Sequence, residues 1–181
     1  MQRKIFVGID LPVKVKKRLV EKIEKWEKLP IKWIKEDNFH ITLVFLGYIE
    51  DVDLSRICAS ISDAVKDIDT FDVNLDKIEL GPTQGREARL VWFSGQASEE
   101  LKNLQREIEK AIGIFSAEKK EFYPHVTLGR IRAGKWKTLK EIPKIEESFK
   151  VSLSVDSVSI FDSHSEETAG KFIAIENCYL Q

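Results

Sequence analysis

The sequence predicts an α+β fold in which antiparallel sheets are combined with a few amphipathic helices. Three observations favour this class: strand and helix patterns are interleaved along the chain, several strands alternate apolar and polar residues, and a strand–helix–strand order occurs twice. Alternation is typical of a sheet with one solvated face, which favours antiparallel over doubly wound parallel sheets. A chain of 181 residues suits one domain with two lobes, which we place over residues 1–181.

The N-terminal part of the chain is predicted to contain two strong strands with a helix between them. Residues 3–11 form the first strand, and Pro12 suits the first turn of the helix that follows. Apolar residues recur in that helix at helical spacing, and Pro30 ends it. Residues 31–34 are a short extended piece, and residues 39–47 form the second strand, which ends at a glycine.

The middle of the chain is predicted to hold two helices and two strands. Asp53 is placed to cap the first of these helices. The strands cover residues 71–80, which alternate apolar and polar residues, and residues 88–94. Ser98 opens the second helix, which has glutamates in its first turn, and Gly113 ends it.

Three further strands complete the predicted fold, at residues 125–131, 149–161 and 171–180. Residues 149–161 alternate over their whole length, so we expect one long strand there. A polar connection that contains Pro143 separates it from the strand before it.

The charge balance limits the kinds of nucleic-acid binding that the protein could carry out. It has 29 Lys and Arg residues against 30 Asp and Glu, a formal net charge of −1. Proteins that bind long duplexes by displacing counterions usually carry a strong basic excess. If this protein binds nucleic acid, we expect it to bind a short stretch or an end through local groups.

Cysteine usage and the N-terminus indicate a cytoplasmic protein. Cys58 and Cys178 lie in apolar patterns, without a CxxC pair or metal-ligand spacing to a histidine, so we expect free buried thiols in a reducing compartment. The first residues lack the apolar core and cleavage site of a signal peptide. No apolar run approaches the roughly 18 residues of a membrane span. The many Lys, Glu and Ile residues are typical of a thermophile.

An internal repeat relates the two halves of the chain. His125 lies 85 positions after His40, and each is followed by threonine and leucine at the same distances. At this offset residues 5–7 fall on residues 90–92, and the apolar positions of the first and third helices coincide. Repeated supersecondary units are a fold-level signal. We therefore predict two such units around a pseudo-twofold axis that brings equivalent strands face to face.

Two motifs, His40-Ile41-Thr42-Leu43 and His125-Val126-Thr127-Leu128, place histidine and threonine on one face of a strand. Side chains alternate between faces along a strand, so the apolar pair of each motif points the other way, into the core. A single motif of this kind is commonly structural. Two of them among three histidines, at symmetric positions, indicate a shared site. The third histidine, His164, lies in a polar loop and lacks the threonine.

Two histidines with two threonines suit a displacement reaction at a phosphate. An imidazole has an ordinary pKa of about 6.5, so one ring can be neutral and the other protonated near neutral pH. The neutral ring would take a proton from water, and the charged ring would give one to the departing oxygen. Threonine hydroxyls would donate hydrogen bonds to the non-bridging oxygens. A 2′,3′-cyclic phosphate has its own strained leaving group, so no metal is obviously required.

Other uses of these residues have less support in the sequence. Zinc needs three or four ligands in tight geometry, and neither motif has a second ligand nearby, so we assign no metal site. The G-x-S-x-G elbow of serine hydrolases and the phosphate-binding P-loop are both missing from the sequence.

The two motifs, together with Gly129-Arg130 after the second and the opening strand Phe6-Val7-Gly8-Ile9, resemble the signature of the 2H phosphoesterases. Within that superfamily the chain is similar, over nearly its whole length, to the RNA 2′,3′-cyclic phosphodiesterases historically called 2′-5′ RNA ligases. The resemblance implies two antiparallel-sheet lobes, with helices on their outer faces, around a central cleft that bears both His-x-Thr motifs. It also implies hydrolysis of the cyclic phosphate to a 2′-phosphate without metal or cofactor, and in some members weak 2′-5′ joining of RNA ends.

By position, the resemblance makes His40 and His125 the catalytic pair and assigns Thr42 and Thr127 to phosphate binding. We assign His40 as the acid on the 3′ oxygen and His125 as the base that activates water. The pseudosymmetry of the two motifs makes this order nearly interchangeable.

Two further residues are candidate substrate ligands. Arg130 matches the family's basic residue after the second motif and would balance phosphate charge. Strand parity would turn Arg130 away from His125, unless Gly129 introduces a bulge that re-aims it. Tyr123 precedes the second motif, and Pro124 biases it to an extended conformation from which its ring could stack on a base.

Three functional hypotheses remain open. The first is a phosphodiesterase whose partners are RNA ends that carry a 2′,3′-cyclic phosphate. The second is the same chemistry on a small nucleotide, which would be insensitive to RNA length. The third is a non-catalytic module whose binding of RNA ends would survive the loss of either imidazole. In each case we expect a monomer without an obligate protein partner and without membrane attachment.

Overall fold

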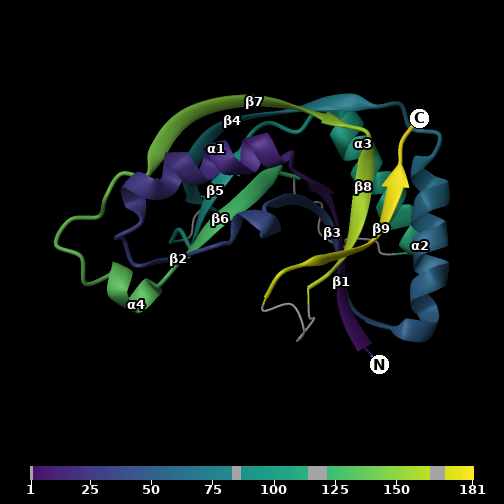
Figure 1. The fold of residues 1–181 in the computed structure, drawn as a ribbon, viewed down its shortest axis with the longest axis horizontal. Coiled ribbons are helices and arrows are strands. Elements are labelled where there is room, and N and C mark those ends of the chain that lie inside the picture. Colours follow the sequence, from purple (N-terminus) through teal and green to yellow (C-terminus); the bar gives the residue numbers. More distant parts are fainter. Residues whose placement is uncertain (1, 83–86, 114–121, 164–169) are drawn as a thin grey trace.

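The computed structural model describes residues 2–82, 87–113, 122–163 and 170–181 of the chain. Within these residues, nine strands form one sheet in the order β7-β4-β5-β6-β3-β1-β8-β9, with β2 paired to β6, and every recorded pairing is antiparallel. This arrangement confirms the predicted α+β class (Figure 1). The strands are β1 (Gln2–Asp10), β2 (Ile31–Trp33), β3 (His40–Glu50), β4 (Phe71–Gly81), β5 (Leu90–Ser94), β6 (His125–Ile131), β7 (Glu146–Val155), β8 (Ser157–Asp162) and β9 (Ile173–Tyr179). The helices are α1 (Val13–Ile23), α2 (Asp51–Val65), α3 (Glu99–Ile112) and α4 (Ala133–Trp136), with 3-10 turns η1 (Glu24–Trp26) and η2 (Glu36–Asn38).

The two histidine strands meet at the centre of the sheet. Within the described residues, β3 and β6 pair only through Ile41 and Val126, which are themselves related by the repeat offset. On either side of this pair the strands follow in corresponding order, as β6-β5-β4-β7 in one half and β3-β1-β8-β9 in the other. Figure 1 shows β4 to β7 on one side of the molecule and β1, β8 and β9 on the other. The pseudo-twofold relation therefore centres on this pair.

The strand register corrects the alignment of the two units at one point. Gly8 of β1 lies opposite Thr42, and Trp92 of β5 lies opposite Thr127. Gly8, and not Val7, is therefore the counterpart of Trp92. The one-residue error arose because β1 is buried continuously along its centre. A continuous apolar run has no alternation from which the register could be read.

Each unit packs its helix against the half-sheet of the other unit. Leu19 of α1 is fully buried, and Cζ of Arg18 lies 4.7 Å from the ring centre of Phe149 in β7. In the second unit, Gln105 of α3 donates a hydrogen bond of 3.0 Å to the carbonyl of Leu43 in β3. This exchange ties together two half-sheets that share a single recorded strand pair.

The strand predicted over residues 149–161 is in fact two strands. β7 pairs with β4 in one half-sheet, whereas β8 pairs with β1 in the other. Between them, the carbonyl of Asp156 accepts a hydrogen bond of 2.8 Å from the backbone N–H of Leu180. The alternating pattern predicts extended backbone but not the identity of the partner strand, so it did not reveal this crossover.

The junction between β3 and α2 also differs from the prediction. β3 does not end at Gly47, which adopts a left-handed φ of 76°, but continues to Glu50. As a result α2 begins at Asp51, and Asp53 lies within its first turn instead of at its N-cap. The ends of α3 are as predicted, because Ser98 accepts a hydrogen bond of 3.2 Å from the N–H of the third helical residue and a left-handed glycine follows the helix.

Three other features bear on the sequence-based expectations. Both cysteines are free, with Cys178 buried and Cys58 partly exposed. The short helix α4 was not predicted; it buries Trp136 against the core. In the described part of the chain, the helices are all too short or too polar to cross a membrane.

Candidate active site at the paired histidines

Both imidazoles are held by the same kind of hydrogen bond. Nδ1 of His40 lies 2.7 Å from the carbonyl oxygen of Asn38, and Nδ1 of His125 lies 2.9 Å from that of Tyr123. Each carbonyl belongs to the residue two positions before the histidine, so the pseudosymmetry extends to the rings. A carbonyl oxygen only accepts hydrogen bonds, so Nδ1 carries the proton in each neutral ring and Nε2 is the basic atom.

The two rings project from the same face of adjoining strands. Ile41 and Val126 are directly paired and fully buried, so the residues beside them in each strand lie on the opposite face of the sheet. His40 and His125 therefore share that face, which we call the imidazole face. They are near enough that the charge of His125 affects the pKa of His40.

The motif threonines also lie on the imidazole face. Oγ1 of Thr42 is 2.9 Å from Nε2 of His40. Because Nδ1 of that ring holds its proton, the threonine hydroxyl donates this bond when the ring is neutral. Thr127 follows His125 by two positions in β6 and is likewise half-buried. Each imidazole thus has a hydroxyl on its own strand that can contact the same ligand.

Burial lowers the pKa of both imidazoles from the ordinary value of 6.5. Loss of hydration is the largest cause in each case, because a charged ring is less stable away from water. The carbonyl hydrogen bonds oppose this shift. At His40 the carboxylate of Asp10 opposes it as well, by Coulomb attraction, while Lys16 adds to it.

Aromatic rings pack against both imidazoles. The imidazole of His125 lies 4.5 Å from the ring of Trp92, measured between centroids. Three rings surround the other imidazole at centroid distances of 4.6, 5.7 and 5.5 Å. In the same order, these rings belong to Phe6, Phe161 and Phe172.

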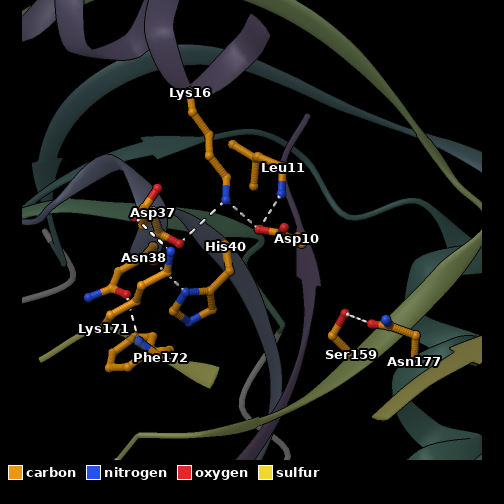
Figure 2. A network of polar contacts seen from close by, with 10 residues as sticks. All are labelled: Asp10, Leu11, Lys16, Asp37, Asn38, His40, Ser159, Lys171, Phe172 and Asn177. Carbon is orange, nitrogen blue, oxygen red and sulfur yellow. Dashed lines mark hydrogen bonds and ion pairs between the residues drawn. The ribbon is translucent and has the colours of Figure 1, made fainter. Parts of the chain in front are cut away.

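An ion pair between a buried lysine and an exposed carboxylate lies beside His40 (Figure 2). Lys16 of α1 is only 8% exposed, and its Nζ lies 2.7 Å from Oδ1 of Asp10 and 3.4 Å from the carbonyl oxygen of Asp37. Asp10 is the residue directly opposite His40 in the β1–β3 pairing. The same carboxylate oxygen accepts a hydrogen bond of 3.0 Å from the N–H of Leu11. These two contacts hold the side chain of Asp10 next to the imidazole.

The position opposite His125 that corresponds to Asp10 holds a serine instead of a carboxylate. Ser94 lies opposite His125 in the β5–β6 pairing, and its hydroxyl donates a hydrogen bond of 2.8 Å to Glu79. The hydroxyl of Tyr123 donates to the same carboxylate oxygen at 3.3 Å. The Tyr123 ring packs against Trp92 at 5.6 Å and is 38% exposed, so part of it remains accessible to a ligand.

A bulge in β6 turns Arg130 towards the imidazole face. Thr127 lies opposite Trp92 of β5 and Arg130 lies opposite Leu90, so three steps along β6 match two along β5. Directly paired residues lie on the same face, and Trp92 and Leu90 share one. Arg130 is therefore on the face of His125 and Thr127, where it is exposed. The bulge absorbs the odd step that would have turned it away.

An equivalent bulge in β3 places Phe45 on the imidazole face. Gly8 lies opposite Thr42, and Phe6 lies opposite Phe45, so the register shifts by one residue between them. Phe45 is 70% exposed, and its ring centre is 6.1 Å from that of Phe6. Sequence reasoning missed Phe45, although the repeat offset counted back from Arg130 leads directly to it.

Other candidate features lie elsewhere or outside the described residues. His164 falls outside them. Among the described residues, no group of three His, Cys, Asp or Glu side chains is placed to hold a metal ion. A surface groove of about 420 Å³ runs between α2 and β9, and its lining includes Cys58 but neither paired histidine.

The family is decided by comparison with known proteins. Residues 12–167 match the model of the 2′-5′ RNA ligase superfamily. The chain belongs to this superfamily. Curated relatives include the RNA 2′,3′-cyclic phosphodiesterase of Thermotoga maritima, which is 28% identical over 190 residues, covering 97% of this chain and 95% of the relative. The enzyme of the same name from Aeropyrum pernix is 32% identical over 145 residues, covering 75% of this chain and 78% of the relative.

Two solved structures share the fold of this 2′-5′ RNA ligase superfamily member. E. coli LigT complexed with 3′-AMP superposes with a TM-score of 0.78 at 20% identity, covering 100% of this chain and 99% of that one. TT0787 of Thermus thermophilus has a TM-score of 0.76 at 20% identity, covering 98% and 97%. The resemblance drawn from the two motifs is thus confirmed for family and fold.

Proposed function

We propose that this protein hydrolyses the 2′,3′-cyclic phosphate at an RNA end to a 2′-phosphate, with His40 and His125 as its acid–base pair and no metal. The observation that carries the proposal is the matched pair of imidazoles. In each, the protonated Nδ1 donates a hydrogen bond to a backbone carbonyl, and the basic Nε2 lies on the imidazole face. The curated relatives, which are named RNA 2′,3′-cyclic phosphodiesterases, support the proposed substrate class.

In the proposed reaction, His125 acts as base and His40 as acid. Nε2 of His125 takes a proton from water, and the water oxygen bonds to phosphorus. The bond from phosphorus to O3′ breaks, its electron pair stays on O3′, and the Nε2 proton of the His40 imidazolium neutralises that oxygen. The products are a 2′-phosphate and a 3′-hydroxyl. The carboxylate of Asp10 supports this order, because it favours the charged form of His40.

The non-bridging phosphate oxygens would be bound by Thr42, Thr127 and Arg130. Once the Nε2 proton of His40 points to O3′, the hydroxyl of Thr42 no longer donates to that ring and can donate to phosphate. Arg130 adds a planar cation on the same face. An RNA 5′-hydroxyl that replaces the water beside His125 would lose its proton to that ring and bond to phosphorus as O3′ leaves, so we propose 2′-5′ joining as a weak side reaction.

The proposal is tested with a short RNA that ends in a 2′,3′-cyclic phosphate, incubated with the enzyme in EDTA. We expect cleavage at an undiminished rate, and phosphorus NMR should identify the product as a 2′-phosphate. Activity that appears only with added metal would contradict the proposal. Tight binding without turnover would instead identify a module that recognises RNA ends.

The pH optimum of kcat/KM should be acidic. The limbs of kcat/KM report the pKa values of the two histidines in the free enzyme, and burial lowers both. We therefore expect the maximum of kcat/KM below the ordinary histidine pKa of about 6.5. A bound phosphate anion favours both imidazolium forms, so the maximum of kcat should lie at higher pH. Initial rates across pH measure both, and a kcat/KM maximum above neutrality would contradict this account.

We further propose that the terminal base lies against Phe45 and that the RNA backbone passes over Arg130. These residues occupy corresponding positions after the two bulges, but one is an exposed ring and the other a cation. Lys32 of β2 lies directly opposite Arg130 and adds a second positive charge on that side. Tyr123, near His125, would contact the preceding base. Unpaired bases stack on aromatic rings, and phosphates bind cations.

Phe45→Ala should lower kcat/KM for an RNA end by about 5- to 150-fold, which corresponds to ~1–3 kcal/mol for one stacked base. An RNA whose terminal ribose carries the cyclic phosphate but no base should react equally well with variant and wild type. Val52→Ala is the control, because Val52 is 88% exposed on α2. Equal losses with the two substrates would contradict the assignment of Phe45.

A further inference from the structure

Asn38 contacts both His40 and the segment that covers it (Figure 2). Its backbone carbonyl accepts the hydrogen bond from Nδ1 of His40 at 2.7 Å. Its side-chain nitrogen donates to the carbonyl of Gly170 at 2.7 Å, and its side-chain oxygen accepts from the N–H of Phe172 at 2.8 Å. Asn38 is only 8% exposed. Both ends of its carboxamide are therefore used to bind residues 170–172, which we call the covering segment.

The covering segment brings an aromatic ring against the imidazole. The ring of Phe172 meets that of His40 at a centroid distance of 5.5 Å and an interplanar angle of 70°. It meets the ring of Phe6 edge-on at 5.3 Å. Lys171 adds an ion pair of 2.9 Å with Asp37, but both side chains are more than half exposed, so this pair contributes little.

The peptide that orients His40 needs such support because it lies outside the sheet ladders. Asn38 ends the single turn η2, and the N–H of Phe39, on the same peptide as the Asn38 carbonyl, donates to the carbonyl of Glu36 at 3.0 Å. One turn of 3-10 helix holds a carbonyl direction weakly. The carboxamide of Asn38 is buried, so breaking its two bonds to the covering segment leaves its own polar atoms unsatisfied.

We infer that Asn38 is a positioning residue for His40: its carboxamide fixes the peptide whose carbonyl orients the imidazole and docks Phe172 against the ring. The inference rests on the acid–base role proposed for His40. Loss of the carboxamide frees the carbonyl to move, so Nδ1 loses its fixed acceptor and the ring can turn or change tautomer. A displacement of about 1 Å at a reacting group can cost on the order of 100-fold in rate.

The test compares Asn38→Ala with Ser159→Ala, a matched control. Ser159 is 6% exposed and donates a hydrogen bond of 2.7 Å to Asn177 of β9, and β1 separates it from the strand of His40 (Figure 2). Both variants lose partly buried hydrogen bonds near the C-terminal strand, so both should unfold more easily. We expect Asn38→Ala to lower kcat about 10- to 100-fold with a smaller change in KM. Ser159→Ala should leave kcat unchanged.

Nitrogen NMR of the imidazoles provides a readout that does not depend on turnover. In the wild type, the His40 ring should carry its neutral-state proton on Nδ1, and Asn38→Ala should shift it towards a mixture of tautomers. His125 is the internal control and should not change. Asn38→Asp keeps the acceptor for Phe172 but places a carboxylate oxygen against the carbonyl of Gly170, so it should also lower kcat; it carries the test if the alanine variant does not fold.

Wild-type kcat and an unchanged His40 tautomer in Asn38→Ala would overturn the inference, as would equal losses of kcat in Asn38→Ala and Ser159→Ala. Failure of the proposed reaction and failure of the role of Asn38 would give different results. An inactive wild type would refute the proposed function, whereas the tautomer of His40 would still decide whether Asn38 orients it.

Discussion

Replacement of either paired histidine by alanine is expected to lower kcat/KM for an RNA 2′,3′-cyclic phosphate by about 10²- to 10⁴-fold, the usual contribution of a positioned acid or base. Each ring donates a hydrogen bond from Nδ1 to a carbonyl and lies on the imidazole face, so each supplies one proton transfer. Initial rates of His40→Ala and His125→Ala beside the wild type measure the loss. Because both substitutions leave the buried Ile41 and Val126 in place, circular dichroism should show folded proteins.

The double variant gives the sharper result. An acid and a base that act in one step lose their effect together, so removal of both should cost little more than removal of one. Added imidazole should restore part of the activity to each single variant, since it can occupy the vacated volume. A single variant with wild-type kcat/KM would show that the two rings are not a catalytic pair.

Alanine in place of Gly95 is expected to destabilise the fold by about 1–3 kcal/mol or more, the range for an overpacked core. A Cβ at this position would lie 2.1 Å from the carbonyl oxygen of Asn74 and 2.9 Å from Cα of Leu75. Both are backbone atoms of β4, which cannot rotate away. The N–H of Gly95 also donates to the carbonyl of Pro124 at 3.3 Å, beside the second motif, so activity should fall as well.

Gly134→Ala is the matched control and should have the opposite sign. A Cβ on Gly134 meets no atom within 4 Å, and the residue lies in α4. Alanine is favoured over glycine in a helix by roughly 1 kcal/mol, so this variant should be slightly more stable. Urea unfolding of both variants beside the wild type measures the difference. Equal midpoints for Gly95→Ala and the wild type would show that β4 can move aside.

The sequence by itself determined the family and the face on which the candidate site lies. The strand period of two puts His40 and Thr42 on one face and Ile41 on the other, and this depends only on neighbouring residues. The repeat offset located the second motif without any knowledge of packing. Strand parity led to the idea that a bulge at Gly129 re-aims Arg130, and the register contains such a bulge.

Only the tertiary structure decided which residues surround each imidazole. The side chain of Asn38 binds Gly170, 132 positions away, and Lys16 of α1 reaches Asp10 of β1 beside the ring. The division of residues 149–161 between two half-sheets is of the same kind. Local patterns specify the conformation and the buried face of a segment, because these depend on the residue and its neighbours. Contacts between distant segments depend on how the whole chain packs, and no local pattern carries that information.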